Sequence, residues 1–107
     1  MNTSAVVIEV EQLRRNAGAA GQRLKALGNP DRLLLLCQLV QGEMNVGELE
    51  ECLQIVQPTL SQQLGVLRRE GLVDTRRDGR QIYYSISSSH ALAVIETLHV
   101  LYCETDQ

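Results

Sequence analysis

The stretch that decides the fold is NVGELEECLQIVQPTLSQQLGVLRREGLVDTRRDGRQIYYSI, residues 45–86. Asn45 has the character of a helix N-cap, Glu48 follows three residues later, and apolar residues then recur at helical spacing. A second helix is predicted from Pro58, which suits a first helical position because its missing N–H would be unpaired there, to a stop at Gly71. Two short helices with a tight break between them are predicted.

Two strand segments follow these helices. Residues 72–76 and 81–86 have strand character, and Asp78-Gly79 between them is a strong hairpin signal. A helix, a break, a second helix and a hairpin in this order are typical of a winged helix-turn-helix. The predicted fold is mainly α-helical with a two-stranded β-wing, and DNA is the ligand that this arrangement favours.

The outward face of the second helix carries side chains suited to reading DNA. At about 100° per residue, Leu60, Leu64 and Leu67 form one apolar stripe. Gln62 points away from that stripe, and an amide there can pair bidentately with adenine. The same residue types are ordinary on any solvated helix, so this hypothesis depends on the flanking elements. The expected DNA contacts from this segment are Gln57, Thr59, Ser61, Gln62, Arg68 and Arg69.

Three arginines, Arg76, Arg77 and Arg80, cluster at the predicted hairpin tip. Arginines on a hairpin beside a recognition helix suit phosphate contact or insertion into the minor groove. An ordinary solvated turn is the alternative, and it would be served as well by Lys, Glu or Ser. We therefore add these three residues to the expected DNA contacts.

The net charge of −3 is unevenly spread along the 107 residues. Residues 57–86 hold five arginines against three acidic residues, a local balance of +2, whereas the segment before them is acidic. Such a local surface can serve DNA binding, because counterion release depends on the phosphates contacted rather than on total charge. The length favours a single domain over residues 1–107.

Helical segments are predicted on both sides of this unit. Residues 5–27 read as an amphipathic helix, and Asn29-Pro30-Asp31 begins another that continues through Val40 and is expected to be deeply buried among its leucines. After three serines, the segment from Ala91 to Tyr102 carries one broad apolar stripe. This stripe suggests a dimer interface, together with the N-terminal helix, although simple packing on the core is the alternative.

The sequence argues against several other classes of protein. The sequence contains no apolar run of 18 residues, so no transmembrane helix is predicted. The polar start does not resemble a signal peptide, and a cytoplasmic protein is therefore expected. Three cysteines without a close CxxC pair do not indicate a disulfide framework. No nucleophile–base set or phosphate-cradling loop is present, so an enzyme is not expected.

Three segments together resemble the ArsR/SmtB family of dimeric winged-helix regulators, over nearly the whole chain. They are ALGNPDRLLLLCQLVQGE (26–43), NVGELEECLQIVQPTLSQQLGVLRREGLV (45–73) and TRRDGRQIYYSI (75–86). The resemblance implies a homodimer, joined through its first and last helices, that reads a pseudo-palindromic DNA operator with two helices in successive major grooves.

Many members of this family sense metals, but the metal-ligand positions differ here. The thiolate site of the family has cysteines where this chain reads Asn45-Val46-Gly47. At the C-terminal-helix site, His90 and Glu104 match, but Ser88 and Leu101 stand where the other ligands belong, and Glu104 cannot hold a metal with His90 alone. We therefore expect no metal and no other cofactor.

Two cysteines, Cys37 and Cys103, match the pair of the HlyU-like and BigR-like branch, whose members respond to persulfides and other reactive sulfur. The resemblance implies that a thiolate attacks an oxidised sulfur donor and that the second cysteine captures the product as a sulfur-bridged crosslink. Cys37 is expected to be buried, and Cys103, near the chain end with His99 one turn away, to react first. The alternative is that Cys37 only fills the core. Cys52 has no counterpart in this branch.

The sequence thus predicts a homodimeric DNA-binding transcriptional regulator, most simply a repressor, whose operator affinity is switched by reactive sulfur through the cysteine pair. A second interpretation keeps the fold but makes it a constitutive anti-repressor, a virulence-type activator or a peroxide sensor. A third, of another class, is a winged helix used only to bind protein. The operator and the inducer are not revealed by the residues.

Overall fold

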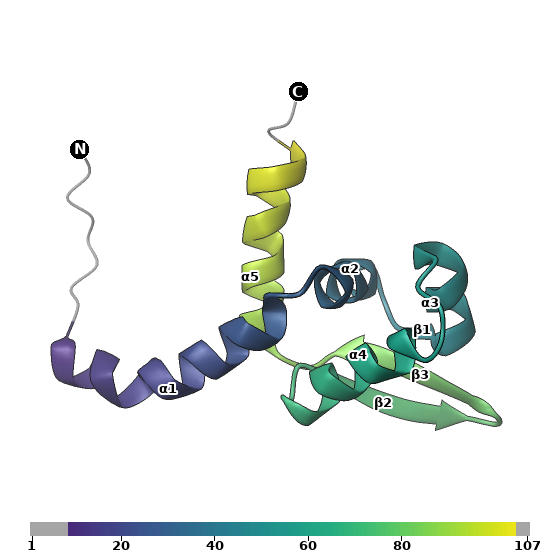
Figure 1. The fold of residues 1–107 in the computed structure, drawn as a ribbon, viewed down its shortest axis with the longest axis horizontal. Helices are drawn as coiled ribbons and strands as arrows, with labels where there is room; N and C mark the ends of the chain where they lie inside the picture. The colour runs from purple at the N-terminus through teal and green to yellow at the C-terminus, as the bar shows by residue number, and fades with distance from the viewer. Residues whose placement is uncertain (1–8, 105–107) are drawn as a thin grey trace.

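The computed structural model describes residues 9–104, and the chain forms a winged helix-turn-helix flanked by two projecting helices (Figure 1). Residues 5–8 of the expected N-terminal helix lie outside the described residues. The elements in chain order are α1 (Val10–Leu27), α2 (Pro30–Leu39), β1 (Met44–Asn45), α3 (Val46–Leu53), α4 (Thr59–Arg69), β2 (Val73–Asp78), β3 (Gln81–Ile86), α5 (Ser89–His99) and a π-helical segment, η1 (Val100–Glu104).

A leucine-rich core joins α2, α3 and α4 to the sheet. The apolar stripe predicted on α4 is confirmed, because Leu60, Leu64 and Leu67 are at most 1% exposed. Leu35 and Leu36 of α2 are also fully buried in this cluster. Burial of these side chains fixes which face of α4 is turned to solvent.

The helix starts follow the predicted capping signals. Asn45 and Glu48 form a capping box, with each side chain accepting a hydrogen bond from the other residue's backbone N–H, at 2.8 and 2.9 Å. The Asn29 side chain likewise accepts from the backbone N–H of Arg32 at 3.0 Å. The prediction for Pro58 is off by one residue, because Pro58 is the N-cap and the helix begins at Thr59.

The end of α4 occurs where the glycine signal placed it. α4 ends at Arg69, and Gly71 has a φ of +73°. This left-handed conformation suits glycine because it has no Cβ. It lets the N–H of Leu72 donate to the carbonyl of Leu67 at 2.9 Å, which closes the last turn before β2.

The sheet has three antiparallel strands in the order β1-β3-β2, one more than the two-stranded wing that the sequence predicted. β1 has only two residues, too few for a strand pattern to appear, and it pairs Asn45 with Tyr83 of β3. The hairpin signal was displaced by one residue, since Asp78 pairs with Gln81 and the turn consists of Gly79 and Arg80. Gly79 has a φ of +65°, as such a turn requires.

The two flanking helices extend away from the winged unit (Figure 1). Within α1 only Ala26 and Leu27 are buried, so nearly all of this helix is open to solvent. α5 buries Ala91 and Ile95 against the core. None of the helices in the described part of the chain is long and apolar enough to cross a membrane.

The expectation that α2 is buried on most sides was wrong. Leu35, Leu36 and Leu39 face the core, but Leu34 is 46% exposed and Cys37 is also exposed. α1, α3, α4, α5 and β3 all pack against α2, but they leave open the side that bears Cys37. The leucines of α2 therefore extend around more of the helix surface than the neighbouring elements can cover.

Candidate nucleic-acid interface

The outward face of α4 presents the polar side chains expected to meet DNA. Ser61, Gln62, Arg68 and Arg69 are exposed, and Thr59 is half-buried at the start of the helix. Their exposure follows from the leucine stripe on the opposite side, which holds this face outward. The helix lies along one edge of the molecule together with the hairpin (Figure 1).

Gln57 and Ser61 are joined before any DNA is present. The Gln57 side-chain oxygen accepts from the backbone N–H of Ser61 at 3.1 Å and from its hydroxyl at 2.7 Å. Gln57 therefore satisfies one of the free N–H groups of the first turn of α4, as a cap does. The two residues form one preordered unit at the N-terminal end of the helix.

Arg77 and Arg80 are exposed on the wing, as predicted, whereas Arg76 is already engaged. The Arg76 Nε lies 2.9 Å from both carboxylate oxygens of Glu43, and its guanidinium carbon lies 4.7 Å from the centroid of the Tyr83 ring. The hydrogen bond to Arg76 lowers the pKa of the Glu43 carboxyl, and the same contact raises the pKa of Arg76. The three arginines are thus not equivalent, because among the contacts within residues 9–104 Arg76 alone binds both oxygens of a carboxylate.

The predicted cysteine pair consists of one residue in α2 and one in η1, near the C-terminal end of the chain. Cys37 is exposed on α2, which corrects the expectation that it is buried, and Cys103 is exposed in η1. Partial burial raises the pKa of the Cys37 thiol, and the charge of Cys103 raises this pKa further. α5 packs against α2, and Val100, the first residue of η1, lines the same depression as Cys37, so η1 begins beside this part of α2.

A shallow depression adjoins Cys37. It has a volume of about 280 Å³ and is lined by residues of α2, α5 and η1, including Cys37, Ile95, Glu96 and His99. His99 therefore shares a cavity wall with Cys37, whereas the sequence associated it with Cys103. Cys52 lies apart from both on α3, where it is exposed.

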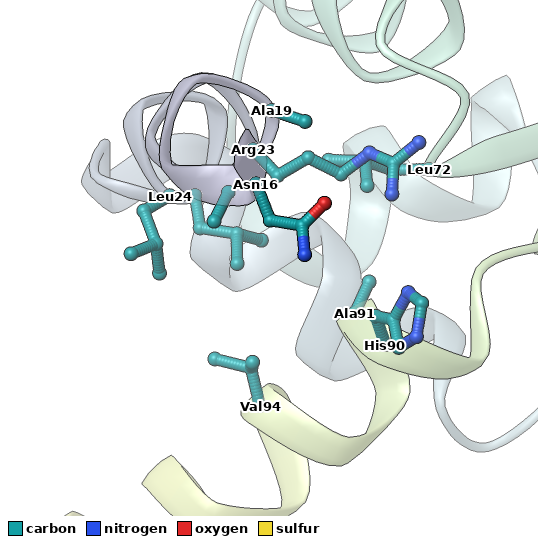
Figure 2. Close-up of a pocket in the computed structure, with 10 residues that line it drawn as sticks. Asn16, Ala19, Arg23, Leu24, Leu72, His90, Ala91 and Val94 are labelled. Carbon is teal, nitrogen blue, oxygen red and sulfur yellow. The ribbon is translucent and has the colours of Figure 1, made fainter. Parts of the chain in front are cut away.

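A larger apolar pocket of about 410 Å³ separates α1 from α5. Figure 2 shows Asn16, Arg23 and Leu24 of α1 on one side, facing His90 and Val94 of α5 on the other. Apolar side chains on both projecting helices remain open to solvent. The most exposed are Val10, Leu13, Leu24, Val100, Leu101 and Tyr102.

Comparison with known proteins identifies the family. A family model described as "Bacterial regulatory protein, arsR family" matches residues 29–75. The chain is 47% identical over 100 residues to the biofilm growth-associated repressor of Agrobacterium fabrum, covering 94% of this chain and 86% of that protein. The chain belongs to the arsR family. A second member, the transcriptional activator HlyU of Vibrio cholerae, is 42% identical over 94% of this chain and 93% of its own length.

Solved structures of arsR-family members agree with this fold. The crystal structure of the transcriptional repressor BigR from Xylella fastidiosa superposes with a TM-score of 0.83 at 45% identity, covering 90% of this chain and 98% of that one. A homodimeric winged helix-turn-helix domain from Mycobacterium bovis has a TM-score of 0.75 at 26% identity, covering 95% and 94%. This arsR-family chain is a DNA-binding transcriptional regulator.

The metal-ligand positions of this arsR-family chain can now be located. Asn45 and Gly47 lie at the start of α3, and His90 lies in the wall of the larger pocket. Within residues 9–104, no three His, Cys, Asp or Glu side chains gather closely enough to hold a metal ion. The described residues therefore do not supply the ligands that are missing from the family's two metal sites.

Two residues at this interface escaped the sequence analysis. Glu43 appeared only as part of an acidic segment, yet it binds Arg76 across 33 positions of sequence. Arg32 was given no role, yet its guanidinium donates to Gln63 of α4 at 2.7 Å. No local pattern indicates either contact, since each depends on how distant elements pack.

Proposed function

We propose that this regulator is a homodimeric repressor that reads a pseudo-palindromic operator and releases it when reactive sulfur crosslinks Cys37 to Cys103. The observation that carries the proposal is the placement of these two exposed thiols, one on α2 and the other in η1, whose first residue lines the same depression as Cys37. A pair of exposed, neighbouring cysteines is accessible to an oxidised sulfur donor and to each other. Similarity to two repressors supports the sense of regulation.

In the proposed DNA complex, α4 of each subunit lies in the major groove and the wing lies beside it. Gln62 reads base edges, with Thr59 and the Gln57–Ser61 unit at the N-terminal end of the helix. Arg68, Arg69, Arg77 and Arg80 contact phosphates and position the protein, and Arg76 joins them once it is free. The exposed apolar side chains of α1 and of η1, which continues α5, support a dimer through these helices, as does the similarity to a homodimeric winged helix-turn-helix domain.

The proposed switch needs a polysulfide, R–S–S–SH, as the oxidant. One cysteine thiolate attacks the inner sulfur, the bond to the departing sulfur breaks, RS⁻ leaves, and the cysteine carries –S–SH. The second thiolate attacks the sulfur next to the first cysteine and HS⁻ leaves, which completes a trisulfide between Cys37 and Cys103. Each cysteine loses its proton to solvent, and two sulfur atoms of the donor are reduced to the thiolate and sulfide that leave.

A crosslink between α2 and η1 would act on DNA binding through α5. η1 continues α5 directly, and α5 forms one wall of the pocket that faces α1. Pulling the end of α5 toward α2 changes the surface that the second subunit meets. The distance between the two α4 helices then no longer matches one turn of DNA, about 34 Å.

The experiment measures operator release and sulfur mass together. We expect polysulfide to add an intramolecular Cys37–Cys103 link with extra sulfur by mass spectrometry and to abolish binding to a duplex selected by the reduced protein. Cys37→Ser and Cys103→Ser should each prevent the release, and Cys52→Ser, which removes an equally exposed thiol, should not. Release of DNA from the Cys37→Ser protein would overturn the two-cysteine mechanism.

A second candidate is a constitutive anti-repressor or activator of the same fold, favoured by the 42% identity to a protein named a transcriptional activator. Such a protein would bind its site regardless of sulfur donors. A reporter placed downstream of the selected site distinguishes the two, because only the repressor reading predicts higher expression on deletion of the regulator. A peroxide sensor would give a product with no bridge, or with a bridge that contains no added sulfur, in the same mass analysis.

A further inference from the structure

The carboxylate of Glu43 binds Arg76 in the manner in which arginine binds phosphate. Both Glu43 oxygens lie 2.9 Å from the Arg76 Nε, and the Nη2 group also donates to one of them. Two oxygens on one guanidinium edge reproduce the bidentate geometry of arginine with a phosphate group. Glu43 therefore occupies the donors that a DNA backbone would use.

The sheet holds this contact in place. Asn45, Tyr83 and Arg76 lie side by side across β1, β3 and β2, and Glu43 immediately precedes β1. Arg76 must extend across Tyr83 to reach Glu43, and its guanidinium carbon lies 4.7 Å from the ring centroid. The third strand, β1, thus carries a carboxylate to the arginine of the wing.

The contact remains open to exchange. The side chains of Arg76 and Glu43 are 53% and 36% exposed, so water and a phosphate can both reach them. An exposed ion pair contributes little to folding and is weakened by salt. Asp78, whose carboxylate is 3.9 Å from Arg76, adds a weaker second attraction on the same side.

We propose that Glu43 determines specificity by withholding Arg76 from DNA that lacks the operator sequence. This inference rests on the proposed function, in which the wing lies against the DNA backbone. Non-specific binding is almost entirely electrostatic, so each withheld arginine lowers the affinity for random DNA. On the operator, the base contacts of α4 hold the wing against the backbone, and a phosphate replaces Glu43.

The test is a set of salt titrations with a random-sequence duplex and with the duplex that the reduced wild-type protein selects from a random pool. Glu43→Gln should tighten binding to random DNA and steepen its salt dependence by about 0.9 for each subunit whose Arg76 reaches a phosphate. Binding to the selected duplex should change less, so discrimination falls. Glu43→Ala should behave alike, and circular dichroism checks that each variant is folded.

The decisive control makes the same Glu43 substitution in a protein that lacks Arg76. In an Arg76→Gln background, Glu43→Gln should leave both the affinity and the salt slope for random DNA unchanged. Glu51→Gln, which removes the same charge from an exposed position on α3, measures the effect of net charge alone. An equal gain from Glu51→Gln, or a gain from Glu43→Gln that persists without Arg76, would refute the inference.

Failure of the inference and failure of the proposed function give different results. If the wild-type protein binds duplex DNA with a steep salt slope but Glu43→Gln matches it, only the role of Glu43 is overturned. If the wild-type protein shows no salt-dependent binding to either duplex, the proposed wing contact fails and the inference fails with it. Insensitivity to polysulfide affects neither result, because these titrations use the reduced protein.

Discussion

At the scale of single residues, the chemistry of this regulator depends on which groups already have partners. Ser61 donates its hydroxyl to Gln57, and Arg76 is held by Glu43. The charge of Cys103 contributes to the raised pKa of the Cys37 thiol, and no covalent bond joins the two residues. Each of these contacts sets how readily a side chain can meet an external ligand.

The Cys37 thiol should become reactive only at higher pH than an ordinary cysteine. Its pKa is raised first by partial burial and then by the charge of Cys103, so the thiolate fraction falls as the pH drops below that raised value. We expect the alkylation rate of Cys37, followed by mass spectrometry, to rise with a midpoint above that of a free thiol.

The Cys103→Ser variant separates the two causes of the raised pKa. Removing the neighbouring negative charge should lower the Cys37 midpoint but not restore it fully, because partial burial remains. Cys52→Ser provides the matched control and should leave the midpoint in place. An unchanged midpoint in Cys103→Ser would mean that the two thiols are too far apart to form the proposed bridge.

At the scale of elements, polar links tie α1 to the middle and to the C-terminal end of α4. The Gln22 side chain donates to Glu70 at 2.9 Å, just past the end of α4. Arg32 donates to the carbonyls of Lys25 and Ala26 at the end of α1 and to Gln63 in α4. The helix proposed to carry the dimer contact is thereby connected to the helix proposed to read DNA.

Arg32→Ala should destabilise the fold by about 1–3 kcal/mol, because it removes hydrogen bonds from a charged donor and leaves two carbonyls of α1 without it. Gln63→Ala removes only the link to α4 and should cost about 1 kcal/mol or less. Urea unfolding of both variants at one protein concentration measures the difference. Equal losses in the two variants would show that the bonds to α1 contribute nothing.

Elements with local signals were predictable from the sequence, and contacts between distant elements were not. The capping box at Asn45 and the stop at Gly71 are encoded within a few residues, so both were confirmed. Pairing of β1 with β3 and the binding of Glu43 by Arg76 join segments more than thirty positions apart. The exposure of Cys37 likewise depends on which neighbours fail to cover α2, and no periodicity in α2 contains that information.

At the scale of the whole molecule, the open face between α1 and α5 is incomplete in a single chain. The pocket there has a volume of about 410 Å³ and is walled mainly by apolar side chains of both helices. A homodimeric winged helix-turn-helix domain from Mycobacterium bovis has the same fold. A second copy of the chain is the proposed occupant.

Leu24→Glu should weaken the dimer by roughly 3–5 kcal/mol, since it buries an uncompensated charge at the proposed contact. Lys25→Glu introduces the same residue one position later, outside the residues that line the pocket, and should leave the dimer intact. Sedimentation equilibrium over a range of protein concentrations measures both. A Leu24→Glu protein that sediments as the wild type does would place the dimer contact elsewhere.

Asn45 belongs to two elements at once, as the last residue of β1 and as the N-cap of α3. Because Asn45 serves both elements, the chain can tolerate a change of length in some places and not in others. Extra residues at Gly79 and Arg80 would lengthen the hairpin tip and leave the helices where they are. One residue inserted after Asn45 would separate the capping box from the strand pairing, so relatives of this chain should differ in length at the tip and keep a fixed length between β1 and α3.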